Sequence, residues 1–170
     1  MGSLLRFRRF LFLLAFLALC LGTPVSWLTV VQADNRAVVW ARPVRQGEVF
    51  YLRYTHSVTR RQVEDTYKLD EGNVVLTATR FEAVGAGLGY MGEGTIRAEK
   101  GWTVIEGMNR RLKFLPLRVG AVADHRLVYR GKEYHLWYYA PAYSLVHIGT
   151  SRGTVVHWLW WKYANKRQKG

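Results

Sequence analysis

The stretch EVFYLRYTHSVTRRQVEDTYKLDEGNVVLTATRF, residues 48–81, contains three runs rich in Val, Tyr and Thr, separated by two polar connections. Apolar and polar residues alternate within these runs, which is typical of strands with one buried face. The glycine of the second connection, DEGN at 70–73, supplies the positive φ that a tight hairpin turn needs. The stretch therefore predicts three consecutive antiparallel strands, over 48–58, 62–70 and 73–81.

The rest of the chain after Asn35 continues this pattern of short runs rich in β-branched and aromatic residues. Further strands are predicted over 36–42, 94–99, 102–107, 111–119, 125–130, 133–139, 143–150 and 154–163. Helical periodicity is not convincing anywhere in this part, and neither a repeat nor a linker divides it. These patterns predict an all-β domain, either a single antiparallel barrel or a two-sheet sandwich of about ten short strands.

The N-terminal segment has a different composition. Three arginines within residues 6–9 precede an uncharged run over 10–31, as in export signals. One interpretation is a signal peptide cleaved after the small residues of VQA, 31–33. The other is an uncleaved signal anchor, because about 20 apolar residues span a bilayer. A Gly-Thr-Pro break at 22–24 favours the signal peptide, and the basic flank predicts export to a periplasmic or extracytoplasmic location in either case.

We therefore divide the chain into a signal peptide or signal anchor over 1–33, an all-β domain over 34–163 and a basic tail over 164–170. The whole chain has a net charge of +13, and three of its 25 basic residues but none of its 12 acidic ones lie before residue 34. The exported part thus favours anionic partners, namely phospholipid head groups, an acidic protein face or a small anion. The basic residues are scattered, so a solvated basic surface is the alternative. Because an exported protein rarely meets nucleic acid, nucleic acid is not expected as a partner.

Metal and cofactor sites are not expected. The only cysteine, Cys20, lies in the N-terminal segment, so the exported part contains no disulfide and no cysteine metal site. The five histidines lack the H-x-H or H-E-x-x-H spacing of common metal sites. A G-x-G-x-x-G pattern at 87–92 is followed by a predicted strand rather than by the helix that dinucleotide binding requires.

Alternation along the opening stretch places His56 and Asp65 on the apolar side of the hairpin, and Ser57 and Glu64 on the outer side. A simple turn within 58–62 would set Asp65 opposite His56 or opposite Tyr54, the next residue on the same face. The same alternation places Arg80 on the apolar face of the third strand. Three inward charges must be paired or bind something, because an isolated buried charge is costly.

Three interpretations of this cluster stay open. It is a buried polar group that fixes register, or a carboxylate pocket with Arg80 as a fork and His56 as a donor, or an acid–base pair of His56 and Asp65. Ser57 is a poor nucleophile because it points away from His56. The following glycine-rich segment, with Gly85 and Gly87, is a long connection or an anion-binding nest of backbone N–H groups.

The last predicted strand is aromatic on both faces. Trp158, Trp160 and Trp161 precede several lysines and an arginine. This combination fits a strand buried on both faces. It also fits a contact with a membrane surface, because Trp beside basic residues favours the head-group level.

Four segments together resemble a bacterial family catalogued as domain of unknown function 1850. They are YTHSVTRRQVEDTY (54–67), FEAVGAGLG (81–89), GMNRRLKFLPLRVG (107–120) and DHRLVYRGKEYHLWY (124–138), and the resemblance covers about residues 37–150. Where the family often has Pro after GAGL, this chain has Gly89. The resemblance implies a small exported protein encoded beside TRAP transporters of the TAXI type, which take up organic acids. It supplies no catalytic residue.

We therefore expect a non-enzymatic accessory or partner of such an uptake system. The expected carboxylate-binding residues are His56, Asp65, Arg80, Gly85, Gly87 and Arg110, and the carboxylate belongs either to a small anion or to a transporter subunit. The first alternative is a structural module that docks on membrane or transporter. The second is a small hydrolase or isomerase that uses His56 and Asp65.

Overall fold

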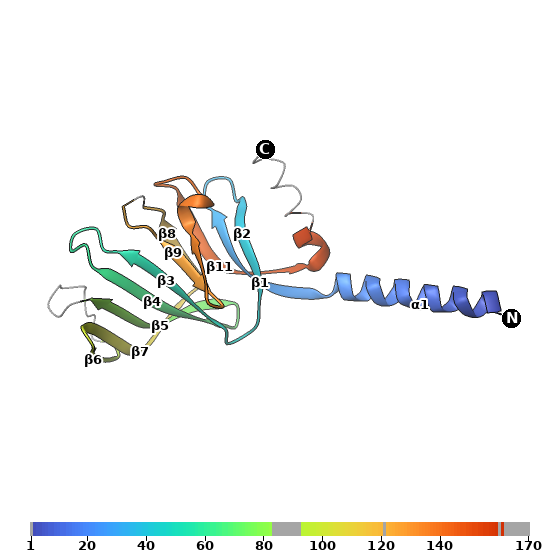
Figure 1. Cartoon of the computed structure of the whole chain (residues 1–170), viewed down its shortest axis with the longest axis horizontal. Helices are drawn as coiled ribbons and strands as arrows, with labels where there is room; N and C mark the ends of the chain where they lie inside the picture. Colours follow the sequence, from blue (N-terminus) through green and yellow to red (C-terminus); the bar gives the residue numbers. More distant parts are fainter. Residues whose placement is uncertain (1, 83–92, 121, 160, 162–170) are drawn as a thin grey trace. The chain divides into compact units, whose positions relative to one another are not determined.

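The computed structural model describes residues 2–82, 93–120, 122–159 and 161, with the backbone alone for 2–5 and 15–20 (Figure 1). Its elements in chain order are α1 (Gly2–Gly22), β1 (Pro24–Gln32), β2 (Val38–Val44), β3 (Val49–Thr55), β4 (Gln62–Asp70), β5 (Asn73–Glu82), β6 (Thr95–Glu99), β7 (Trp102–Leu112), β8 (Phe114–Arg118), β9 (Arg126–Tyr129), β10 (Lys132–His135), the 3-10 helix η1 (Leu136–Tyr138) and β11 (Leu145–Thr154). Among the described residues, no helix has the length and apolarity needed to cross a membrane.

The strands form two sheets. One has four strands in the order β2-β1-β11-β8, and the other has seven in the order β10-β9-β3-β4-β5-β7-β6. Every strand pair with a described register is antiparallel. The chain passes from the larger sheet to the smaller one at Lys113, between β7 and β8. The all-β prediction is confirmed, as two sheets that do not close into a barrel.

Two compact units divide the chain, residues 28–151 and residues 1–27 together with 152–170. The larger unit has one main core, to which both sheets contribute. Leu28 of β1 and Ile148 of β11 come from the smaller sheet, and Phe50 of β3 and Leu127 of β9 come from the larger sheet; all four are fully buried. Because a shared core joins the two sheets, the unit is a two-sheet sandwich.

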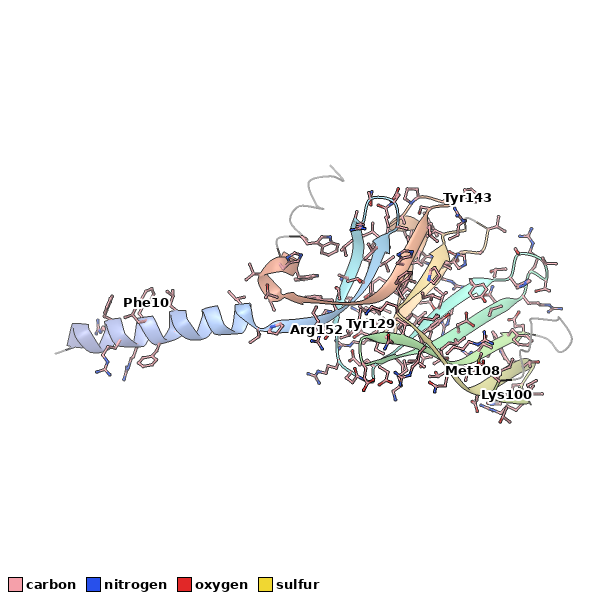
Figure 2. The ribbon with its side chains drawn as sticks, turned by 180° about the vertical axis from the view of Figure 1, so that it is seen from behind. Phe10, Lys100, Met108, Tyr129, Tyr143 and Arg152 are labelled. Atoms are coloured by element: carbon pink, nitrogen blue, oxygen red, sulfur yellow. The ribbon has the colours of Figure 1, made fainter. Side chains whose placement is uncertain are left out.

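Tyr129, labelled in Figure 2, shows how the two sheets meet within this unit. It ends β9 of the larger sheet and is buried, with its ring edge-on to Trp40 of β2 at a centroid distance of 6.4 Å. Its hydroxyl lies 3.0 Å from the Pro43 carbonyl of β2 and 2.5 Å from the Glu48 carboxylate. The polar end of this core side chain is therefore satisfied by groups next to the smaller sheet, as a buried hydroxyl requires.

The smaller unit contains α1, the first residues of β1, the last residues of β11 and the residues that follow β11. In it, the Trp27 indole donates a hydrogen bond to the Gly153 carbonyl at 3.2 Å and stacks on Trp158 at a centroid distance of 5.2 Å. Residues 155–159 and 161 are helical, so the strand predicted over 154–163 is wrong for these residues; only Thr154, the last residue of β11, is in a strand. Trp160 lies outside the described residues, and Trp161 is partly buried.

Strand β1 was missed by the sequence-based strand prediction. Its residues belong to the uncharged run that was assigned to the export signal, and Leu28 and Val30 are nevertheless fully buried in the sandwich core. A fully buried strand and the apolar part of a signal have the same composition, so hydrophobicity alone cannot separate them. The structure therefore adds an N-terminal strand to the predicted set.

Candidate functional site

Asp65 lies on the core face of the larger sheet, as predicted. It is opposite Leu52 in β3 and Thr79 in β5. The Thr79 hydroxyl donates a hydrogen bond of 2.6 Å to Oδ1 of Asp65, and the hydroxyls of Tyr54 and Tyr67 also donate to this carboxylate. The described residues include no cation paired with Asp65, so its charge depends on three hydroxyl donors from three strands.

Burial raises the pKa of Asp65, and the hydrogen bonds from Thr79, Tyr54 and Tyr67 only partly oppose that effect. Burial raises the pKa of both tyrosines, and the Asp65 carboxylate raises it further. A mostly buried acid held only by hydroxyls corresponds to the register-fixing interpretation of this cluster. Its partners are two tyrosines and a threonine, in place of His56 and Arg80.

We predict a pH-dependent effect for Asp65→Asn. The carboxyl has a raised pKa in the folded chain, so its contribution to stability is full below the ordinary value of 3.8 and is lost as pH rises through the folded value. The amide of the variant has no such titration. The free energy of unfolding of the variant, measured by urea unfolding, should therefore improve relative to that of the native chain as pH rises above 3.8. A difference that stays constant or moves in the opposite direction would contradict this assignment.

His56 is not the partner of Asp65. It follows the end of β3, where its Nδ1 accepts the backbone N–H groups of Val58 and Thr59 at 3.4 and 3.3 Å. The last strand pair is Thr55 with Gln62, so the loop begins at His56. The predicted register is therefore wrong: Asp65 faces Leu52, roughly 13 Å along the strand from His56 at 3.3 Å per residue.

Arg80 also departs from its predicted face. The ladder between β4 and β5 shifts at Thr77, since Thr66 pairs with Ala78 while Tyr67 pairs with Leu76. Such a bulge inserts one residue and reverses the faces that follow it. Arg80 thus pairs with Glu64 on the outer face, opposite to the side of Asp65. Strand β5 contains no glycine that would mark this bulge in the sequence.

Glu64 lies on the outer side of the hairpin, as predicted, but it is the most buried charge of the described chain at 5% exposure. It lies between two arginines of neighbouring strands. The Nε of Arg80 is 2.8 Å from Oε1 of Glu64, outside hydrogen-bonding geometry, and Nε of Arg53 donates to Oε2. Because both arginines are about 40% exposed, a buried anion here orients two half-exposed cations.

The ion pairs continue from Arg53 across the sheet. Arg53 pairs with Glu133, Arg126 lies 3.3 Å from Glu133 and 3.4 Å from Asp124, and Asp124 is 2.8 Å from Nδ1 of His135. Arg53 is directly opposite both Glu64 and Arg126, and Arg126 is opposite His135, so these side chains share one face. We call this row over β5, β4, β3, β9 and β10 the charge ladder; its members are Arg80, Glu64, Arg53, Glu133, Arg126, Asp124 and His135.

The segment that carries Asp124 is held in place by the strands around it. The Thr55 N–H donates to the Ala123 carbonyl at 2.8 Å, and the Leu136 N–H donates to the His125 carbonyl at 2.9 Å. Burial by itself raises the pKa of Asp124, but His135, the Trp137 indole and Arg126 together bring it below the ordinary value. Asp124 is thus a fixed anion at the end of the charge ladder.

Two exposed aromatic residues adjoin this end. Trp137 donates its indole N–H to Oδ1 of Asp124 at 3.2 Å, and its ring lies tilted against that of Tyr138 at a centroid distance of 3.7 Å. Both rings also contact His135 edge-on. Trp137 is 45% and Tyr138 62% exposed. The sequence reasoning missed this aromatic pair because it continued the strand through 133–139, whereas the strand ends at His135 and a 3-10 turn follows.

The other predicted site residues are not brought together with these. Arg110 of β7 is opposite Leu76 of β5 and pairs with Glu93 at 2.9 Å. Gly85 and Gly87 lie outside the described residues. Within the described ranges, no group of three or more His, Cys, Asp and Glu side chains could hold a metal ion. The His56, Asp65 and Arg80 cluster is therefore divided among a loop, the core face and the outer face.

The fold and the charge ladder together define an all-β, two-sheet domain whose larger sheet carries a row of alternating charges on its outer face. Residues 50–136 match the family model described as Domain of unknown function (DUF1850), and the chain belongs to this family. The matched residues run from β3 to the start of η1 and include the whole charge ladder. Neither the comparison with curated proteins nor that with solved structures found a match.

Proposed function

We propose that the domain is a non-catalytic binding module that recognises an acidic face of a partner protein, as an accessory of an organic-acid uptake system. The observation that carries the proposal is the continuity of the charge ladder with the exposed Trp137 and Tyr138. Trp, Tyr and Arg are the residues that contribute most often to binding energy at protein interfaces. One face of the larger sheet presents residues of all three types.

The arginines of the charge ladder suit carboxylate recognition. A guanidinium binds a carboxylate through two parallel hydrogen bonds when its orientation is fixed. Glu64, Glu133 and Asp124 fix Arg53, Arg80 and Arg126 before any partner arrives. Because the side chains are already ordered, less conformational entropy is lost on binding. The positive charge of the chain would also attract an acidic partner from a distance.

The same geometry favours binding over catalysis by His56 and Asp65. Proton transfer requires an acid and a base within hydrogen-bond reach of the same substrate atoms. His56 is engaged in its own loop, and Asp65 is enclosed by hydroxyls on the core face of the sheet. Membrane docking through the C-terminal tryptophans has less support, since Trp158 is stacked on Trp27.

The test is capture of subunits of a TAXI-type TRAP transporter by the purified full chain. The double variant Trp137→Ala, Tyr138→Ala should weaken capture at least tenfold, which corresponds to about 1.4 kcal/mol. Ile96→Ala is the matched control, because Ile96 is an exposed apolar side chain (48%) on β6, at the opposite edge of the same sheet. Arg126→Lys tests the guanidinium fork, since it keeps the charge and removes the two-point geometry.

Two outcomes would contradict the proposal. Capture that both the double variant and Arg126→Lys leave unchanged would exclude the charge ladder as the binding surface. In the second outcome, succinate stabilises the chain against heat, Arg126→Lys abolishes this stabilisation, and no transporter subunit is captured. That result would identify a free organic acid, instead of an acidic protein face, as the ligand.

A further inference from the structure

Strand β1 occupies an interior position in the four-stranded sheet, between β2 and β11. Its Leu28 and Val30 are fully buried and belong to the main core of the larger unit. Thr29 of the same strand is buried and donates its hydroxyl to the Gly149 carbonyl at 3.3 Å. These residues lie before Ala33, at which the sequence suggested a signal-peptide cut.

A cut after Ala33 would fall in the connection between β1 and β2. That connection is ordered by hydrogen bonds from the N–H of Gln32 to the Ala37 carbonyl and from the N–H of Ala33 to the Leu145 carbonyl, both 2.9 Å. Without β1, strand β2 would lose the only neighbour that it has among the described strands. Strand β11 would gain an open edge, and the core would lose two of its fully buried side chains.

We propose that β1 is a permanent strand of the mature domain, and that any cut which removes the N-terminal segment lies before Pro24. The helix α1 ends at Gly22, so only Thr23 separates it from the strand. Cys20 and Gly22 are two small residues at the spacing that a signal peptidase requires, which makes the bond before Thr23 compatible with this rule. The Val31 and Ala33 pair has the same spacing but lies in or next to a strand that the fold needs.

The experiment is to express the full chain with its own N-terminal segment in a bacterial host and to purify the folded protein through a C-terminal tag. Intact mass and tryptic peptides then locate the N-terminus, since trypsin cuts after Arg36. We expect the folded protein to contain residues 24–33, whether the leader is removed before Thr23 or retained. A dominant folded form that begins at Asp34 would overturn the proposal.

A pair of variants tests the same point during processing. Ala33→Phe places a bulky residue before the suggested cut, and Ala33→Ser keeps a small one. The proposal predicts the same N-terminus for both variants and for the native chain. Accumulation of the unprocessed precursor with Ala33→Phe alone, together with normal processing of Ala33→Ser, would show that the cut after Ala33 is used. The N-terminus of the native protein remains decisive if Ala33→Phe does not fold.

Discussion

Replacing Phe50 by alanine should lower the free energy of unfolding by about 3–5 kcal/mol, the usual cost of deleting a fully buried aromatic side chain. Phe50 has no exposed surface and stacks on Tyr67 of the neighbouring strand at a centroid distance of 5.1 Å. It belongs to the main core that both sheets share. Removal of the ring would leave a cavity. The two sheets cannot move together to fill it, because each sheet is held by its own hydrogen bonds.

Urea unfolding followed by tryptophan fluorescence measures this loss. Tyr51→Ala is the matched control, because Tyr51 is the next residue in β3, points to the opposite face and is 37% exposed. We expect the control to cost less than about 1 kcal/mol, as most surface substitutions do. Equal losses for the two variants would show that β3 does not have one buried and one exposed face.

The sequence predicted the local parts of the fold well. The glycine turn in DEGN is a two-residue hairpin turn, in which Glu71 and Gly72 both have positive φ. Alternation also placed Asp65 of β4 on the core face. These features could be predicted because a tight turn and a two-residue period depend only on residues close together in the chain.

The wrong predictions came from features that shift the alternation of side chains along a strand, or the pairing of two strands, by a few residues. The loop after β3 begins at His56 instead of after Val58, and Thr77 is an extra residue in β5. Each change reverses or displaces the side chains that follow it. Arg80 therefore joined Glu64 on the outer face, and the predicted three-residue cluster did not form. The charge ladder could not be predicted from the sequence, because it depends on the order of five strands in the sheet.

Glu64→Gln should lower the free energy of unfolding by about 2–3 kcal/mol. Removing one member of a buried ion pair typically costs about 3–5 kcal/mol, because a desolvated charge is left without its partner. The lower value applies here because Arg53 and Arg80 are 36% and 43% exposed, so water screens part of the charge. The glutamine keeps the shape of the side chain, so the loss reports on charge alone.

Glu99→Gln provides the control for this prediction, since Glu99 pairs with Arg97 on β6 and both side chains are about half exposed. We expect that variant to unfold at the same urea concentration as the native chain. Adding Arg80→Met to Glu64→Gln should recover part of the stability, because Arg53 then no longer has a second uncompensated cation near it. Losses from Glu64→Gln and Arg80→Met that simply add would mean that the two side chains are not coupled, and that the charge ladder does not extend to β5.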